Sequence, residues 1–427
     1  MTDRRLRLLY VQPAPLFGGA ERQAAEQAAC LPEFGIDVTV MAGPGEAIID
    51  WLRERGAGSV IHSPNFPEAG RPRSSLRRAL LPASFIERGV RARAEMAELV
   101  RSRSIDVMVA SLPFAWITGS LVAKRAGIPI AWRAGGYYIN PAQVAGMWSL
   151  THFLRPDLLI CNGKAVERTF HPLIPAPVEI LPNGVNTSVF NPRQGRPELY
   201  RPAGARWVVG FAGRLATTKR PEDVIHLARS LRESHPDVRV LIAGEGSRRP
   251  GYERLARALG ADNVTFLGYV ADMPSFYAAC DVVVLPSMTE GSSNMLLEAM
   301  ACGRPVVASD IPPLREQIEP EVTGLLYPLG NVPELTRTVR RLLLEPELRH
   351  RLAEQGRAVA ERSTIRASAE RLSQILWRLA AATTATPARD PGAARRTGTP
   401  VPASSAASLR VDRPNPGTRP SDHPDSG

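Results

Sequence analysis

The stretch DVVVLPSMTEGSSNMLLEAMACGRPVVA, residues 281–308, contains a strand, a turn, a helix and a second strand in the order that parallel sheets require. Its apolar run at 281–285 lacks strict alternation, which is typical of a strand buried on both faces of a sheet. The helix ends at Gly303, and Pro305 begins the next strand. This unit predicts a doubly wound α/β sheet.

The turn inside this stretch has the composition of an anion-binding site. Small residues let a ligand approach the backbone closely, and free N–H groups at a helix start attract negative charge. Glu290 precedes the turn and Glu298 lies just over one turn inside the helix, so two carboxylates can bind hydroxyls at the two ends of one ligand. We expect Asn294 to cap the helix, with the turn formed by Gly291, Ser292 and Ser293.

Similar apolar runs recur on both sides of this unit and alternate with segments of helical periodicity. Strand–helix alternation of this kind predicts parallel sheets with helices on both faces. The runs lie at 6–11, 37–42, 59–62, 106–111, 129–133 and 157–160, and then at 207–212, 238–243, 264–267, 281–285, 305–308 and 324–327.

The pattern restarts after a segment rich in Pro, Arg and Gly, which predicts two domains. We expect two Rossmann-like doubly wound parallel-sheet domains that face a central cleft, where such sheets bind ligands. The tail is poor in large apolar residues, so we expect it to be disordered. The expected bounds are 1–190 and 205–363 for the domains, 191–204 for the linker, 364–380 for a final helix and 381–427 for the tail.

Composition excludes several classes of protein but does not select a partner. The 427 residues are 44% hydrophobic and 22% charged, so the chain is neither disordered throughout nor a small disulfide-stabilised fold. The net charge is +11, and only three of the 53 basic residues are lysines. A basic surface suits nucleic acid, anionic lipid or phosphorylated ligands, and an arginine-favouring genome produces the same balance.

The cysteines and the apolar stretches indicate a protein of a reducing compartment without a membrane-spanning helix. The uncharged apolar stretch 107–123 contains Pro113 and is shorter than the ~20 residues of a spanning helix. The N-terminus is a poor signal peptide. We expect no transmembrane segment and a location in the cytoplasm or on the inner membrane surface. We also expect reduced, buried thiols, because no CxxC pair occurs among Cys30, Cys161, Cys280 and Cys302.

Two basic residues follow the predicted strand at 207–212. Arg214 and Lys219 are expected at the carboxyl end of that strand, where a parallel sheet binds its ligands. Arginine binds diphosphate oxygens through a planar fork, and lysine acts as a point charge. Gly18 and Gly19 form a second turn, which suits either a phosphate at a helix start or simply a tight turn.

Together these motifs resemble retaining glycosyltransferases with the GT-B fold, specifically glycosyltransferase family 4. The resemblance rests first on Glu290-x7-Glu298 followed by Ala-Met-Ala-x-Gly-x-Pro-Val-Val. Further matches extend over about residues 6–379 and comprise Gly18-Gly19-Ala20-Glu21-Arg22, Leu181-Pro182-Asn183-Gly184-Val185-Asn186, Gly213-Arg214-Leu215 with Lys219, Gly244-Glu245-Gly246 and Leu267-Gly268-Tyr269-Val270.

The resemblance implies a role for each motif. Glu298 would bind the nucleotide ribose, Arg214 and Lys219 would stabilise the departing diphosphate, and Glu290 with the backbone of the turn would hold the donor sugar. The implied catalytic residues are thus Glu290, Arg214 and Lys219, and the implied donor-binding residues are Glu298, Gly291, Ser292, Ser293, Asn294, Gly18, Gly19, Gly244, Tyr269 and Val270.

The resemblance also implies an acceptor-side N-terminal domain, a donor-binding C-terminal domain and a final helix that crosses back to the first domain. The donor would be UDP- or GDP-linked, and the acceptor a glycan, a lipid-linked molecule or a small molecule. We expect no further cofactor and no divalent metal, because fixed cations would stabilise the diphosphate and the sequence has no Asp-x-Asp pair.

One position departs from the family pattern. The family often has a histidine after the fifth strand of the N-terminal domain, where this chain reads Ala131-Trp132-Arg133-Ala134-Gly135-Gly136. Arg133 would take that place on the acceptor side, where it could bind phosphate or an acidic acceptor.

Other interpretations remain open at the level of the sequence. The segment 71–103 holds nine arginines and fits either an amphipathic surface that contacts anionic membrane or a solvated helix–loop–helix. The whole chain could be another GT-B enzyme, such as a nucleotide-sugar epimerase or an inverting transferase, or a basic protein that binds nucleic acid or another anionic surface. It has no zinc knuckle or RNA-recognition signature, so we expect no nucleic-acid partner.

Overall fold

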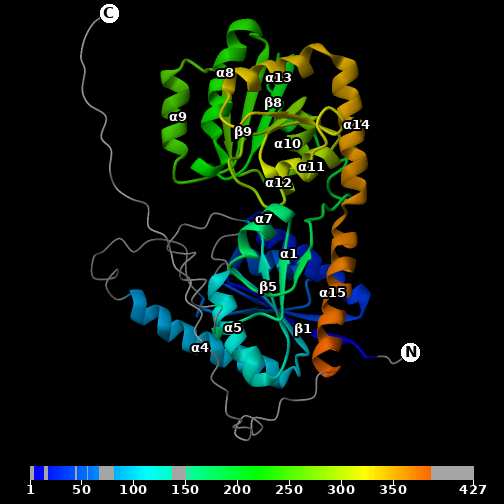
Figure 1. Cartoon of the computed structure of the whole chain (residues 1–427). Helices are drawn as coiled ribbons and strands as arrows, with labels where there is room; N and C mark the ends of the chain where they lie inside the picture. Colours follow the sequence, from blue (N-terminus) through cyan, green and yellow to red (C-terminus); the bar gives the residue numbers. More distant parts are fainter. Residues whose placement is uncertain are drawn as a thin grey trace, which may run out of the picture. The chain divides into compact units, whose positions relative to one another are not determined.

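The computed structural model describes residues 4–13, 18–43, 46–54, 56–66, 81–136, 151 and 153–385. These residues form two parallel sheets with helices packed on them, one sheet in each half of the chain (Figure 1). Two doubly wound α/β domains were the expected architecture, and the topology confirms it.

The first sheet has seven described strands in the order β3-β2-β1-β4-β5-β6-β7, with every neighbouring pair parallel. Its strands are β1 Leu6–Gln12, β2 Ile36–Ala42, β3 Ser59–His62, β4 Val107–Ser111, β5 Ile130–Ala134, β6 Leu158–Cys161 and β7 Val178–Ile180. The helices of this half are α1 Gly19–Cys30, α2 Glu46–Glu54, α4 Leu81–Ser102, α5 Leu112–Ala126 and α7 Lys164–Phe170.

The second sheet has six described strands in the order β10-β9-β8-β11-β12-β13, again parallel throughout. Its strands are β8 Trp207–Ala212, β9 Val238–Ala243, β10 Val264–Gly268, β11 Val282–Leu285, β12 Val306–Ser309 and β13 Leu325–Tyr327. The helices are α8 Pro221–Ser234, α9 Arg249–Ala258, α10 Met273–Ala279, α11 Asn294–Ala301, α12 Pro312–Arg315, α13 Val332–Leu344 and α14 Pro346–Arg362.

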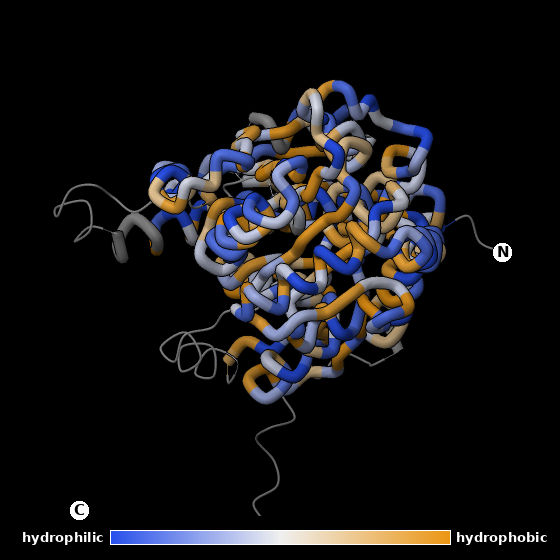
Figure 2. The backbone as a smooth tube through the Cα atoms, turned by 90° about the horizontal axis from the view of Figure 1, so that it is seen from above, coloured by the Kyte–Doolittle hydropathy of each residue, from blue (hydrophilic) through white to orange (hydrophobic). Residues whose placement is uncertain are grey.

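Each sheet is buried on both faces. Successive side chains of a strand point to opposite sides, so each strand contributes to two apolar clusters. In β1, Leu9 and Val11 join one apolar cluster, whereas Leu8 and Tyr10 join another. The strands of the second sheet divide between two clusters in the same way. Figure 2 shows the corresponding pattern along the chain, in which hydrophobic stretches alternate with hydrophilic ones. No helix in the described ranges is both long and apolar enough to cross a bilayer.

The last helix, α15 (Ile365–Ala385), packs on the first sheet although it follows the second in the chain. Its apolar residues recur at helical spacing and enter the cluster that contains Leu8, Tyr10 and Val38. They are Leu372, Ile375, Leu376 and Leu379. Trp377 adds a hydrogen bond from Nε1 to the carbonyl oxygen of Phe34, at 3.3 Å.

The structure differs from the expectations in four places. Residues 381–385 continue α15, so the predicted tail begins too early, and its remainder lies outside the described residues. The edge strand β7 was missed because Glu179 interrupts its apolar run. Cys30 is half-buried rather than buried. The predicted linker contains a short 3₁₀ turn, Pro197–Leu199, and packs on α10 through a hydrogen bond from Arg196 N to Ser275 Oγ, at 2.8 Å.

The packing of α15 predicts that shortening one of its buried side chains strongly destabilises the protein. Leu376 is 0% exposed, so Leu376→Ala should lower the free energy of unfolding by about 2–5 kcal/mol. Leu344→Ala is the matched control, because Leu344 is 61% exposed at the end of α13, and its cost should stay within about 0.5 kcal/mol. Guanidinium unfolding of both variants measures this; equal losses would contradict the packing of α15 on the first sheet.

Candidate functional site

The predicted motifs lie at the points where the strand order of each sheet reverses. In the first sheet β1 and β4 are neighbours, and in the second β8 and β11 are neighbours, so the connections from each pair run in opposite directions. Ligands of doubly wound sheets bind at such points, outside the carboxyl ends of the strands. Gly18 follows β1, Arg214 follows β8 and Glu290 follows β11.

Lys219 and Glu290 form an ion pair at the carboxyl end of the second sheet. Lys219 ends a short 3₁₀ turn, and Arg220 continues with a φ of 48°, a left-handed conformation that turns the chain into α8. Ser287 Oγ donates to Glu290 Oε1 at 2.7 Å, so the carboxylate is fixed from two sides. Glu290 is only 9% exposed, and a buried carboxylate requires such a cation. The structure thus brings together these two predicted residues.

Ser293, rather than Asn294, caps α11. The Ser293 side chain accepts from the backbone N–H of Leu296, and Asn294 is already the first helical residue. The expected cap is therefore wrong by one position, because both residue types favour this place and the backbone decides between them. The Ser293 N–H donates to Gln317 Oε1 at 2.7 Å, so the chain itself occupies one amide of the turn.

The turn lies directly against the first half of the chain. A Cβ on Gly291 would lie 2.6 Å from the side chain of Asn162 and from the carbonyl oxygen of Gly135. Asn183 Nδ2 donates to the carbonyl oxygen of Ser292 at 2.9 Å and to Asn294 Oδ1 at 2.6 Å. Glycine is needed at position 291 because two backbones meet there.

The first turns of α1 and α11 also touch each other. Asn294 Nδ2 donates to the carbonyl oxygen of Gly19 at 2.7 Å. Gly18 N–H donates to Glu21 Oε2 at 3.0 Å, which provides an acceptor at the start of α1. Burial raises the pKa of Glu21, and the positive charge of Arg214 counteracts part of this rise. Arg214 is exposed, so its guanidinium is free to meet a ligand at this position.

Glu298 is buried, and its two carboxylate oxygens have partners from different halves of the chain. Oε1 forms an ion pair with Arg22, which lies in the first turn of α1. Oε2 accepts from the hydroxyl of Tyr277 on α10 at 2.9 Å. Burial raises the pKa of Tyr277 well above its usual value, so this hydroxyl stays a donor. The predicted ribose-binding carboxylate is thus held in place on both oxygens.

The remaining donor-side residues have different environments. Gly244 has a φ of 134°, and a side chain there would collide with the carbonyl oxygen of Gly213, so the close approach of two loops requires glycine. Tyr269 is 76% exposed beside β10. Val270 is buried in an apolar cluster, which leaves only its backbone for a ligand.

Arg133 is buried inside the first domain and held by that domain. Its Nη1 donates to Tyr10 Oη at 2.5 Å and to Gln27 Oε1 at 2.6 Å. Gln27 Nε2 in turn donates to Ser368 Oγ on α15 at 2.7 Å. The partners of Arg133 thus lie within the first domain, and its acceptor-side role stays a prediction.

Two other predictions touch the described residues only in part. In the described ranges, no three His, Cys, Asp or Glu side chains gather closely enough to hold a metal ion, and metal independence stays a prediction. The basic segment 71–103 lies partly outside these ranges. Its described part is the helix α4, on which Ile86 and Val90 are 67% and 51% exposed.

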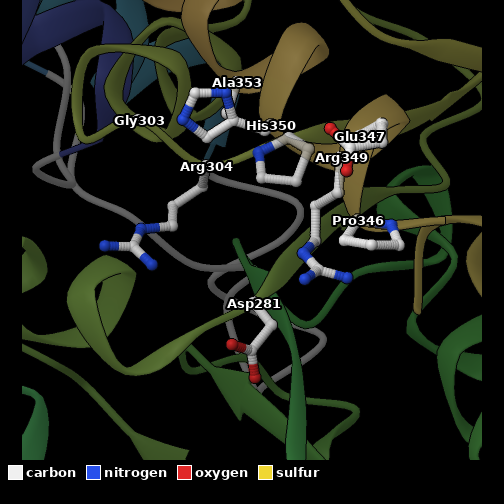
Figure 3. A pocket seen from close by; sticks show the side chains of 9 residues that line it. Asp281, Gly303, Arg304, Pro346, Glu347, Arg349, His350 and Ala353 are labelled. Atoms are coloured by element: carbon white, nitrogen blue, oxygen red, sulfur yellow. The ribbon is translucent and has the colours of Figure 1, made fainter. Parts of the chain in front are cut away.

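A cavity of about 540 Å³ lies at the end of the second sheet opposite to the candidate site (Figure 3). Asp281 and Pro305, which line it, directly precede β11 and β12, so it is at the amino ends of the strands. Its charged groups already serve the fold. Arg304 Nη1 donates to the carbonyl oxygen of Cys280 at 3.0 Å, and Asp281 accepts from Arg201 at 3.0 Å. We therefore do not assign the candidate site to this cavity.

Four residues of the site had no role in the sequence-based prediction. Arg22 and Asn183 lie inside the Gly-Gly-Ala-Glu-Arg and Leu-Pro-Asn-Gly motifs. These motifs indicated that the two residues belong to the site, but they did not indicate which residues they contact. Tyr277 and Gln317 lie in α10 and just after α12, outside every motif. Only the tertiary structure brings them to α11.

The close approach at Gly291 predicts that alanine at this position is destabilising, whereas alanine at a second glycine is tolerated. Gly291→Ala should displace the turn from Gly135 and lower the free energy of unfolding by about 1–3 kcal/mol, as expected for overpacking. Gly136→Ala is the control, because nothing lies within 4 Å of a Cβ at that position. Thermal unfolding of both variants is the measurement, and an unaffected Gly291→Ala protein would show that the turn does not lie against Gly135.

Comparison with known proteins identifies both halves of the chain. Residues 17–189 match the family described as glycosyltransferase family 4, and residues 198–359 match the family described as glycosyl transferases group 1. The chain is 36% identical to the alpha-D-kanosaminyltransferase of Streptomyces kanamyceticus over 174 residues, which are 40% of this chain and 45% of that protein. It is 29% identical to a D-inositol 3-phosphate glycosyltransferase of Salinispora tropica over 401 residues, covering 82% and 80%.

The matches to several curated relatives are partial, and the matches to solved structures concern the fold. The chain spans about half the length of the kanosaminyltransferase and of EpsD from Bacillus subtilis, with 45% and 52% covered. HepE of Anabaena, solved with UDP and glucose, superposes with a TM-score of 0.71 at 20% identity over 88% of this chain and 100% of that one. Sucrose-phosphate synthase of Thermosynechococcus elongatus gives 0.71 at 19% identity, with the same coverage.

These comparisons agree with the architecture of two parallel α/β domains and with the motifs on them. A family 4 domain is followed by a group 1 domain, and 88% of the chain shares the fold of a solved glycosyltransferase. The chain belongs to the glycosyltransferases of the GT-B fold that resemble family 4.

Proposed function

We propose that this chain transfers a sugar from a nucleotide-sugar donor to an acceptor hydroxyl with retention of the anomeric configuration. One observation carries the proposal: Lys219, Glu290 and the first turn of α11 gather at the carboxyl end of the second sheet, with Glu298 buried one turn further on. This is a site with a cation, amide N–H groups and two carboxylates in a row. A diphosphate that carries a ribose on one side and a sugar on the other has the matching chemistry.

The proposed chemistry is stabilisation of the leaving group. Negative charge grows on the β-phosphate as the bond to the sugar breaks, and cations aimed at this charge lower the barrier. Lys219 and Arg214 supply that charge, and Glu290 leaves Lys219 to accept a sugar hydroxyl when the donor binds. Because Gln317 occupies the amide of Ser293, we assign the contact with the donor to the amides of Gly291 and Ser292.

Retention follows, in this proposal, from attack on the same face that the diphosphate leaves. The acceptor hydroxyl forms the new bond to the anomeric carbon, and its proton passes to the departing phosphate oxygen. No side chain of the site is assigned as a base or as a covalent nucleophile, and no divalent metal is required where Lys219 and Arg214 provide the positive charge.

The donor and the acceptor are defined only as classes. HepE, which shares the fold, was solved with UDP and glucose, and this supports a uridine diphosphate donor, with GDP as the second candidate. The acceptor is a glycan, a lipid-linked molecule or a small molecule. For a lipid-linked acceptor, the exposed Ile86 and Val90 of α4 would contact anionic membrane, which co-sedimentation with phosphatidylglycerol vesicles measures.

Two measurements test the proposal directly. Thermal unfolding with UDP, GDP and a single-stranded oligonucleotide should show stabilisation by one of the nucleotides and none by the oligonucleotide. NMR of the product formed from the matching α-linked donor should show an α-linked sugar. A β-linked product would assign the chain to the inverting enzymes, and stabilisation by the oligonucleotide alone would make it a nucleic-acid binder.

Removing the cation at the diphosphate should slow turnover more than it weakens donor binding. Lys219→Ala is expected to lower kcat by about 10²–10³-fold, the usual cost of one transition-state donor, with a much smaller change in KM. Lys124→Ala is the matched control, because Lys124 lies on α5 of the first domain, where it donates to the carbonyl oxygen of Phe153. Steady-state kinetics of both variants measure the split, and a loss confined to KM would remove Lys219 from the chemical step.

A further inference from the structure

Arg22 connects the first domain to the proposed nucleotide site. It lies in the first turn of α1, and its guanidinium forms an ion pair with Glu298 of α11. The same guanidinium lies over the ring of Phe190, 5.6 Å from the centroid. Its side chain is 25% exposed, against 6% for that of Glu298. The largely buried guanidinium of Arg22 is held in this position, because a buried charge without its partner is strongly destabilising.

The carboxylate of Glu298 is satisfied only in part by the chain. Arg22 binds Oε1, and Tyr277 donates to Oε2 at 2.9 Å. Oε1 is buried and, apart from this ion pair, accepts no hydrogen bond in the described part of the chain. Because a carboxylate oxygen accepts up to two hydrogen bonds, both oxygens retain acceptor capacity. Two adjacent acceptor positions on one fixed carboxylate match the two neighbouring hydroxyls of a ribose.

We propose that Arg22 and Tyr277 are positioning residues that hold the Glu298 carboxylate oriented for the 2′- and 3′-hydroxyls of the donor nucleotide. This inference rests on the proposed function and deepens it. Tyr277 supplies a neutral hydrogen bond from within the second domain. Arg22 supplies the compensating charge from the first domain, and without it the buried carboxylate loses its only described cation partner.

The origin of Arg22 in the other domain has a mechanistic consequence. One turn away, Asn294 Nδ2 donates to the carbonyl oxygen of Gly19, so α1 and α11 meet at two consecutive points. The geometry that recognises the ribose is therefore complete only while these two first turns are in contact. Donor binding and the contact between the domains stabilise each other for this reason.

The test compares nucleotides that differ only at the ribose. Isothermal titration of the wild-type chain with UDP, and in parallel with GDP, should show tighter binding than for the 2′-deoxy and 3′-deoxy analogues by about 10-fold or more, because a hydrogen bond to a charged group is lost. Arg22→Gln should reduce this preference to about 3-fold or less, mainly by weakening the ribonucleotide. Arg22→Lys retains the charge and should restore most of the preference.

Two further variants separate positioning from stability. Arg366→Gln is the matched control, because Arg366 also pairs with a glutamate, Glu33, and lies over a ring, Phe34, at 5.3 Å, but on α15. It should keep the full preference. Tyr277→Phe removes one hydroxyl and should lose part of the preference, which provides a second measurement if Arg22→Gln does not fold.

The outcomes are distinguishable. If the wild-type chain binds neither nucleotide, the proposed function fails. If it binds one of them but Arg22→Gln and Tyr277→Phe both keep the wild-type preference for ribose, the positioning role is wrong. Tighter ribonucleotide binding by Arg22→Gln would also overturn it, because Arg22 would then compete with the donor for Glu298.

Discussion

The contact between the first turns of α1 and α11 is the constraint on which the candidate site depends. Both helices direct their amino ends, and hence partial positive charge, toward the same region. Glu21 accepts from the N–H of Gly18 at one helix, and Gln317 accepts from the N–H of Ser293 at the other. Such a region favours anions, and in the proposed complex the donor diphosphate supplies that charge.

Each carboxylate of the site is paired with a cation from another element, which explains how two buried acids are tolerated. Glu290 is bound by Lys219, and Glu298 by Arg22. A buried carboxylate without a cation is strongly destabilising, so these pairs keep the side chains in place before a ligand arrives. Preorganisation of this kind reduces the cost of ordering side chains on binding. In the proposed complex Glu298 therefore keeps its position, whereas Glu290 exchanges Lys219 for a sugar hydroxyl.

The fold was predictable because buried parallel strands leave a strong pattern. Runs such as 207–212 and 238–243 coincide with β8 and β9, since Val- and Ile-rich segments between helices have few alternatives. The misses have local causes. Glu179 interrupts the short apolar run of β7. The start of the tail was set by composition, although residues 381–385 extend α15. The cap of α11 was displaced by one residue because Ser293 and Asn294 suit that position equally.

By itself the sequence determined the two parallel sheets, the turn before α11 and the family, because short motifs and apolar periodicity are local properties of the chain. The tertiary structure decided which groups meet. It paired Arg22 with Glu298, placed Asn183 and Gln317 on the turn, and buried Arg133 beside Tyr10 and Gln27. These partners lie between 24 and 276 positions apart, and no periodic pattern spans such separations. They come together only because the packing of the helices on the two sheets brings distant segments of the chain into contact.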